Sequence, residues 1–288
     1  MPVCTVLLLS LEGGYQSIDS VLSPLKKQTQ LEVLTAAYIH RPVIRSTSLD
    51  TQWINEVQWH LLLVIKGADQ EKILKALPPG AVAKSYSVTA GVPSKIYDRY
   101  RTHTVELRDR SPPALTSSTQ QLPKSLRGGQ DGKPRDSQNL EVSEELLKFA
   151  DELESKEEFR KPVVMLNLLQ FAEGQHESYK NYGKGFARIG ARHGGDAKLV
   201  GLVVPPPADF SVDSRADRSR PAAEWWSEVA YAFYPTIRHF VDMAADPEYQ
   251  DINQKYRLPA LRDTTILCTT EIEPSRFTPE ARTPSAKL

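Results

Sequence analysis

The order strand–helix–strand–strand–helix–strand is predicted twice along this chain of 288 residues. Continuous or alternating apolar runs indicate strands, and apolar residues spaced three and four apart indicate helices. In the first half the predicted elements are a strand over 4–11, a helix from Ser17, strands over 31–39 and 59–66, a short helix from Asp69, and a strand over 81–88. In the second half they are a polar helix over 143–159, a strand over 163–171, a helix over 178–192, strands over 198–204 and 224–234, helices over 237–244 and 249–256, and a strand over 264–272.

A polar segment separates the two halves. Residues 107–140 are rich in Pro, Gly, Ser, Gln and charged residues, and such a composition buries too little apolar surface to offset the entropy of ordering. We therefore expect a first unit over 1–106, a flexible linker over 107–140, a second unit over 141–277 and a disordered tail over 278–288. A second proline-rich stretch over 205–223 is predicted to be a mobile loop or a lid.

Each βαββαβ unit predicts a four-stranded antiparallel sheet with both helices on one face. The opposite face is left apolar and uncovered, which a soluble protein rarely tolerates. Two such sheets in one chain cover each other when they pack face to face. The sequence therefore predicts an α+β fold in which two ferredoxin-like units close a barrel within one polypeptide. We expect a monomer with this internal pseudo-dimer, or a homodimer.

Composition excludes several classes of function. The formal net charge is zero, which weighs against binding nucleic acid or an anionic membrane surface. Cys4 and Cys268 lie in apolar runs and are expected to be buried thiols, and no apolar run is long enough to span a bilayer. We expect a cytoplasmic protein without metal or cofactor, because no nucleotide-binding, serine-hydrolase or zinc motif is present.

Several motifs of the second half resemble those of the domain-of-unknown-function 1330 family, within the dimeric α+β barrel superfamily. They are MLNLLQF (165–171), YKNY (179–182), RHGG (192–195), WSEVAYAFYPTIRHF (226–240), DPEYQ (246–250) and LRDTTIL (261–267) with Arg257. The resemblance spans roughly residues 162–273, and the first half shares only the order of elements. It implies the fold and a pocket in the second half. Relatives in the superfamily are commonly cofactor-free monooxygenases, decarboxylases, isomerases or cyclases, and some bind haem.

Glu228 is the main catalytic candidate. Strand alternation places it on one face with Trp226, Ala230 and Ala232, while the bulkier Val229, Tyr231 and Phe233 lie on the other. We expect the bulky face to pack under the helices and the alanines to leave space in the barrel interior. A carboxylate beside that space would have a raised pKa and could act as a general acid or base. The alternative is a partly solvated carboxylate paired with an arginine.

The other candidates each have a structural alternative. Asn167 interrupts an apolar strand, where its amide either orients a substrate oxygen or satisfies a backbone group at the strand end. Tyr179 and Tyr182 share a helix face with Phe186, so they either pack in the core or hold a substrate oxygen. Trp226 and Tyr234 complete the predicted substrate-binding set.

Two histidines are further catalytic candidates. His193 precedes two glycines and is either a helix C-cap or an acid–base group, and His239 lies beside an apolar helix stripe. If haem were bound, these two would be the candidate axial ligands. Arg257 and Asp263 are expected to pair with each other.

The sequence thus predicts a cofactor-independent enzyme of the decarboxylase, cyclase, isomerase or monooxygenase type. Its substrate would be a small apolar or aromatic metabolite, such as a compound of secondary metabolism, held in the barrel. The alternative is a non-catalytic protein of the same fold that binds a small molecule or a partner chain.

Overall fold

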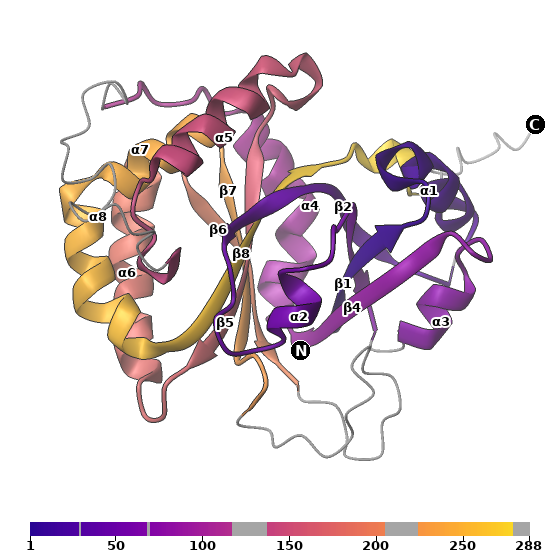
Figure 1. Cartoon of the computed structure of the whole chain (residues 1–288), viewed down its shortest axis with the longest axis horizontal. Coiled ribbons are helices and arrows are strands. Elements are labelled where there is room, and N and C mark those ends of the chain that lie inside the picture. Colours follow the sequence, from indigo (N-terminus) through magenta and orange to yellow (C-terminus); the bar gives the residue numbers. More distant parts are fainter. Residues whose placement is uncertain (29, 68–69, 117–136, 205–223, 279–288) are drawn as a thin grey trace, which may run out of the picture.

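The computed structural model describes residues 1–28, 30–67, 70–116, 137–204 and 224–278. Within them, eight antiparallel strands close into one barrel in the order β1-β3-β2-β8-β5-β7-β6-β4 (Figure 1). The strands are β1 (Val3–Leu11), β2 (Val33–Ile44), β3 (Leu61–Lys66), β4 (Val82–Gly91), β5 (Val163–Phe171), β6 (Asp196–Val203), β7 (Glu228–Tyr234) and β8 (Leu261–Glu271). The predicted α+β barrel is confirmed.

Each half contributes one sheet with the same internal order. The first sheet runs β4-β1-β3-β2 and the second runs β8-β5-β7-β6, so the first and third strands of each unit are central. Two seams join the sheets. The β2–β8 seam extends from Ala37 opposite Glu271 to Ile44 opposite Ile266, whereas the β4–β6 seam is registered at two consecutive pairs. The barrel is therefore closed within a single chain.

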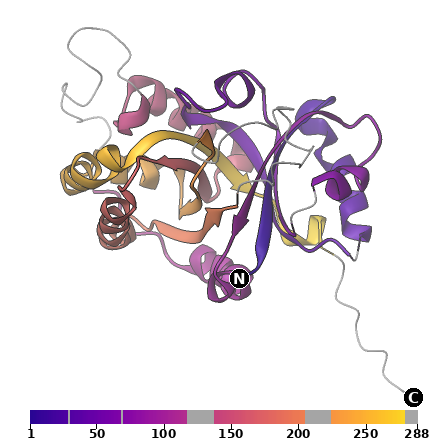
Figure 2. The same cartoon turned by 90° about the horizontal axis from the view of Figure 1, so that it is seen from below.

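Most helices of the two units lie on opposite sides of the barrel, while the last helix of the first unit packs against β6 of the second (Figures 1 and 2). The first unit has α1 (Ile18–Lys27), α2 (Thr51–Ile54), α3 (Gln70–Lys75) and α4 (Ser94–Asp109), and the second has α5 (Glu144–Ser155), α6 (His176–Arg192), α7 (Ile237–Ala245) and α8 (Pro247–Ile252). Under α1 and α3, the outer face of the first sheet is filled by one cluster of buried apolar residues.

Large side chains from both units fill the barrel interior. Val6 of β1, Leu62 of β3, Leu166 of β5 and Phe233 of β7 belong to one buried cluster. An eight-stranded barrel is just wide enough for side chains to fill it. The prediction of an empty interior that holds a substrate is therefore wrong.

Tyr86 joins the two units inside the barrel. The rings of Trp59 and Tyr86 lie 6.5 Å apart, and the indole Nε1 of Trp226 donates to the Tyr86 hydroxyl at 2.6 Å. Each tryptophan stands two residues before the third strand of its unit. Trp226 thus packs in the barrel interior and not, as predicted, on the same face of the sheet as Glu228. It precedes the first residue of β7, so the alternation of the strand does not extend to it.

Helix α4 was not predicted from the sequence. It buries Tyr97, Tyr100, Thr104 and Leu107. The helix extends three residues into the segment assigned to a linker, and the chain is described as far as Thr116. The rest of that segment over 117–136, the stretch 205–223, the tail from 279 and the expected cap Asp69 lie outside the described residues. The division into two units joined by a flexible linker stays a prediction.

Polar side chains fix the helix ends of the second unit. The Thr236 side chain accepts from the amide of Arg238 at the start of α7, and Asp246 accepts from the amide of Glu248 at the start of α8. After α6, Gly194 has a φ of 73°, which favours glycine and turns the chain into β6. The Gly194 turn thus leads directly from the end of α6 into β6.

Candidate functional site

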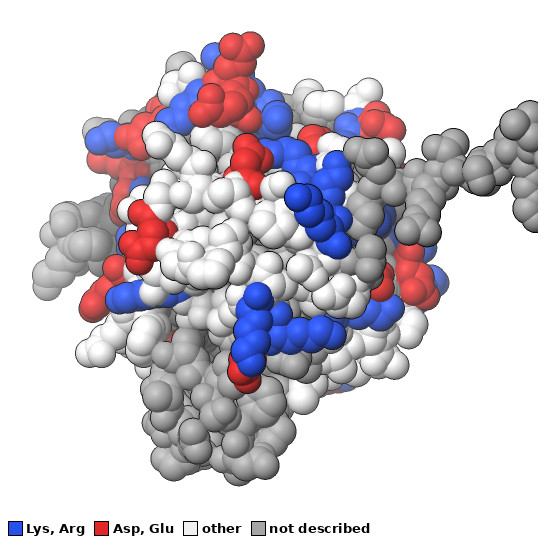
Figure 3. Space-filling view, turned by 90° about the vertical axis from the view of Figure 1, so that its right-hand side faces the viewer, with Lys and Arg blue, Asp and Glu red and all other residues white. Residues whose placement is uncertain are grey.

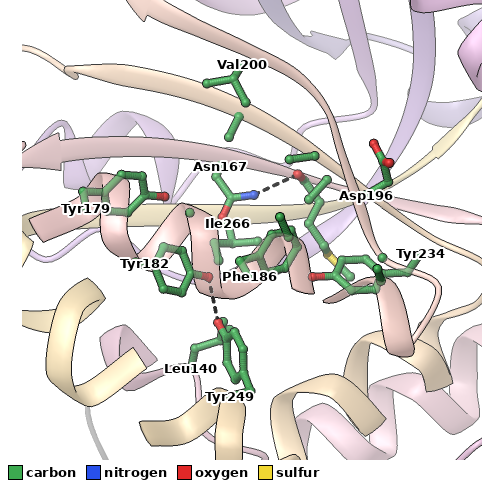
Figure 4. Close-up of a pocket in the computed structure, with 18 of the residues that line it drawn as sticks. Leu140, Asn167, Tyr179, Tyr182, Phe186, Asp196, Val200, Tyr234, Tyr249 and Ile266 are labelled. Atoms are coloured by element: carbon green, nitrogen blue, oxygen red, sulfur yellow. Dashed lines mark hydrogen bonds between the residues drawn. The ribbon is translucent and has the colours of Figure 1, made fainter. Parts of the chain in front are cut away.

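A cavity of about 450 Å³ lies between α6 and the outer face of the second sheet (Figure 4). Met165 and Asn167 of β5, Ala230 and Ala232 of β7, and Ile266 of β8 form its floor, and Phe186 is among the α6 residues on the opposite wall. The pocket therefore belongs to the unit that carries the family-like motifs, but it lies outside the barrel rather than within it.

Small residues create this space. Ala230 and Ala232 face α6 from the sheet, and a Cβ added to Gly183 of α6 would meet no atom within 4 Å. The predicted faces of β7 are therefore reversed, since Tyr231 and Phe233 fill the barrel and the alanine face lies under the helix. Side-chain size alone gave the wrong assignment of the two faces of β7, because a closed barrel needs large side chains in its interior.

Glu228 is the first residue of β7 and lines the pocket. It is 8% exposed, and its carboxylate makes no hydrogen bond within the described part of the chain. No arginine pairs with it there, contrary to the structural alternative. Burial raises the pKa of Glu228 to about 7. A carboxyl group with such a pKa can both accept and donate a proton at neutral pH.

Asn167 lies beside this carboxylate on the sheet. On β5, Asn167 pairs with Ala230 and Leu169 pairs with Glu228, so Asn167 and Glu228 occupy adjacent strands on the same face. The amide Nδ2 of Asn167 donates to the carbonyl oxygen of Met165 at 2.9 Å (Figure 4). The backbone bond orients the amide, and the side chain still lines the pocket.

Four tyrosines line the pocket. Tyr179 and Tyr182 come from α6, Tyr234 from β7 and Tyr249 from α8, and the hydroxyls of Tyr182 and Tyr249 lie 3.1 Å apart (Figure 4). Burial raises the pKa of each of the four. All four therefore stay protonated at neutral pH. One hydroxyl of the Tyr182–Tyr249 pair donates to the other, and the remaining hydroxyl groups can donate to a ligand.

His193 does not line the pocket. It is buried with Nδ1 2.9 Å from Asp242 and Nε2 2.9 Å from Asp246. Both ring nitrogens of His193 therefore face carboxylate oxygens.

His239 is also outside the pocket. Its Nδ1 lies 2.9 Å from the Thr236 hydroxyl, and its Nε2 donates to the carbonyl oxygen of Pro113 at 3.0 Å. In both histidines each ring nitrogen has a protein partner. The structure thus brings Glu228, Asn167 and the predicted tyrosines together, and it places the two histidines and Trp226 elsewhere.

Arg257 and Asp263 do not pair with each other as expected. Arg257 is fully buried and donates to the carbonyl oxygen of Gln138 at 3.1 Å, while its Nη2 has no hydrogen-bond partner among the residues that the structure describes. Its positive charge opposes the effect of burial on the pKa of Tyr182. Asp263 binds a loop of the first unit instead.

Sequence reasoning missed several residues at the edge of the pocket. They are Arg110, His176, Lys180 and Asp196. Arg110 follows α4, whose buried residues are spaced at i, i+3, i+7 and i+10 from Tyr97, and that spacing is the signal that would have found the helix. The polar composition around it concealed the pattern.

The described residues contain no group of three or more His, Cys, Asp or Glu side chains suited to a metal ion. In the same part of the chain, no helix is long and apolar enough to cross a membrane. Figure 3 shows one face of the molecule, on which acidic and basic side chains are interspersed around a broad uncharged area. The expected partners and compartment stay predictions.

Comparisons with known proteins assign no family. No family model and no curated protein matches the chain. Among solved structures, a protein of unknown function from Rhodopseudomonas palustris is 23% identical with a TM-score of 0.33, and the match covers 47% of this chain and 98% of that one. A "putative monooxygenase" from Lactobacillus acidophilus NCFM is 7% identical with a TM-score of 0.41, covering 94% and 93% of the two chains. Another from Fusobacterium nucleatum is also 7% identical, with a TM-score of 0.37 and the same coverage. The strand order, rather than these matches, defines the fold.

Proposed function

We propose that this protein is a cofactor-independent enzyme that moves a proton on a small apolar or aromatic molecule bound between α6 and the second sheet. The observation that carries the proposal is the buried carboxylate of Glu228, which lines an otherwise largely apolar pocket without a hydrogen-bond partner among the described residues. Burying a carboxylate without a partner costs free energy of folding, and perturbed carboxyl groups in clefts are common at active sites.

The proposed step is removal of a proton from carbon. The carboxylate of Glu228 takes the proton from a carbon next to a carbonyl group, the C–H bond breaks, and its electron pair moves onto the carbonyl oxygen to form an enolate. A tyrosine hydroxyl or the Asn167 amide donates to that oxygen and stabilises its charge. Isomerisation, cyclisation and reaction with oxygen can all follow from this enolate. In a decarboxylation the same enolate would form by loss of CO₂, and the protonated Glu228 would then donate a proton to the carbon.

The family-like motifs support this location. Asn167, Tyr179, Tyr182, Glu228 and Tyr249 come from four separate motifs in the sequence, and all five line one cavity. We propose that the second unit is related to the domain-of-unknown-function 1330 family and retains a site. The first unit, whose equivalent space is packed with apolar side chains, has none there.

Hydrogen–deuterium exchange of a carbon acid tests the proposal without knowledge of the natural substrate. The probe is 2-tetralone in D₂O, followed by proton NMR. The wild-type protein is expected to accelerate exchange beside the carbonyl group, and Glu228→Gln to return the rate to that of buffer. Glu173→Gln, which changes an exposed carboxylate after β5, serves as the matched control. Equal rates for wild type and Glu228→Gln would remove Glu228 from the mechanism.

The alternative is a non-catalytic binding protein with the same pocket. It is favoured by one observation, namely that neither His193 nor His239 lines the cavity, where His176 is the histidine among the lining residues. Saturable binding of 2-tetralone without accelerated exchange would support this alternative.

A further inference from the structure

The short segment that follows α4 contacts helix α7 of the second unit. Residues 110–116 follow α4 directly, and the carbonyl oxygen of Pro113 accepts from His239 of α7 at 3.0 Å. The amide and hydroxyl of Thr116 both donate to Asp242 at 2.9 Å, and Asp242 is also held by His193. We call residues 110–116 the strap. The two histidines predicted to be catalytic therefore contribute to anchoring it.

Close packing also fixes the middle of the strap. A Cβ added at Gly194 would lie 3.0 Å from Pro113 Cδ and 2.6 Å from Pro235 Cγ. Gly194 thus allows the strap to lie against the turn between α6 and β6. The strap is thus attached to α7 and packed against this turn, and its first residue lies at the pocket.

That first residue is Arg110, which lines the pocket and is exposed. Its guanidinium pairs with no carboxylate among the described residues. Two other charged groups at the pocket edge are already paired: Lys180 with Glu177 at 3.1 Å, and Asp196 with His103 at 3.1 Å. Arg110 is therefore a cation beside an apolar cavity, free to bind a charge supplied by a ligand.

We propose that the natural ligand of this pocket is an aromatic carboxylate, whose ring lies between α6 and the sheet and whose carboxylate pairs with Arg110. An arginine binds a carboxylate through two parallel N–H···O bonds, which fixes orientation as well as adding affinity. This inference rests on the same pocket as the proposed function and adds the chemical class of the ligand.

Arg110 and Glu228 would together orient the ligand along the pocket. Asp196, at the strap end, pairs with Phe233, and Glu228 lies five residues earlier on β7, which corresponds to roughly 17 Å along the strand. Figure 4 shows Asp196 and Tyr179 at opposite ends of the cavity, and the charge of Glu228 acts on Tyr179. The carboxylate of the ligand is therefore bound at one end, and its reacting carbon lies towards Glu228 at the other.

Paired probes of equal shape test this assignment. We would measure binding of 2-naphthoate and of neutral 2-naphthamide to the full chain by fluorescence titration. The wild-type protein is expected to bind the carboxylate more tightly than the amide. Arg110→Gln should weaken 2-naphthoate binding about tenfold, equivalent to ~1.4 kcal/mol, and leave 2-naphthamide unchanged. Arg110→Lys should recover part of the affinity.

Lys180→Gln is the matched control, because it removes a second pocket-lining cation that already has a partner. It should reduce 2-naphthoate affinity by less than Arg110→Gln. Thermal unfolding of Arg110→Gln should match that of the wild type, since the side chain is exposed.

The inference is overturned if the wild type binds the two probes equally, binds neither, or if Arg110→Gln weakens both alike. It is also overturned if Lys180→Gln causes the larger loss. Failure of the proposed function is a separate result, because it is read from Glu228-dependent exchange of the uncharged 2-tetralone.

Discussion

The carboxylate of Asp263 accepts a hydrogen bond from the backbone amide of Leu49 at 2.7 Å. This bond holds a loop of the first unit against the last strand of the second. The amides of Thr47 and Ser48 donate to the same carboxylate at 3.0 and 2.9 Å. Burial by itself would raise the pKa of Asp263, but these backbone donors lower it below its usual 3.8. The ionised carboxylate therefore stabilises the contact between the two units.

Asp263→Asn should destabilise the protein by about 3 kcal/mol, because the amide group has one acceptor oxygen and places an N–H group among donors. Chemical denaturation at pH 7 measures the change, and the exposed Asp251→Asn is the control. The native pKa is depressed, so the stabilisation is present above pH 3.8 and is lost as the pH falls below it. The two variants should differ less in acid, and an equal difference at all pH values would contradict this account.

Glu228→Gln should stabilise the protein at neutral and alkaline pH. The carboxyl group titrates at 4.5 in the unfolded chain and at about 7 in the folded protein, so folding favours the protonated form. Stability is therefore lost as the pH rises from 4.5 to 7, and the full penalty, about 3 kcal/mol at most, applies above pH 7. Urea denaturation of both proteins at pH 4 and pH 8 measures it. A variant less stable than wild type at pH 8 would show that the carboxylate has an unrecognised partner.

The exchange of 2-tetralone should depend on pH through the same group. A general base acts when it is deprotonated, so the catalysed rate should rise with pH, reach half its maximum near pH 7 and level off above it. The rate constant measured between pH 5 and 9 tests this. A half-maximum near pH 4.5 would indicate a solvated carboxylate rather than the buried one.

Substitutions at Gly183 should separate binding from stability. Gly183 lies inside α6, and a Cβ there meets open pocket space, so Gly183→Ala should stabilise the helix by up to ~1 kcal/mol. Gly183→Leu should fill the cavity and abolish binding of 2-naphthamide while the protein stays folded. Thermal unfolding and fluorescence titration give the two readings.

Gly185, two residues further along the same helix, provides the contrast for this experiment. A Cβ there would lie 2.9 Å from Cδ1 of Ile252, so Gly185→Ala should not gain the same stability. Unhindered probe binding to Gly183→Leu would mean that aromatic molecules bind elsewhere on the protein.

The sequence predicted the succession of strands along the chain well. Both halves contain uninterrupted apolar runs, which are typical of buried strands. The resemblance also pointed to the half whose residues line most of the cavity. Helix α4 was missed because its apolar residues are sparse and its last turn merges with a polar segment. Its absence from the prediction concealed Arg110, which no motif marks.

The position of the pocket could not be derived from one strand. Alternation correctly placed Glu228, Ala230 and Ala232 together, but which face of β7 turns inward depends on how the whole barrel is filled. Likewise, the partners of His193 and His239 come from α7, α8 and the strap, and these contacts are set by tertiary packing. Local sequence patterns identified the candidate polar residues, but tertiary packing determines which of them line the same pocket.

Closure of the barrel within one polypeptide has a consequence for how its two halves change over generations. In a barrel assembled from two copies of one chain, every inherited substitution alters both sheets at once. Here a mutation reaches a single sheet, so the apolar residues under α1 and α3 could fill one hollow while the other stayed open. A single chain can thus keep one outer face solid while the other retains a cavity.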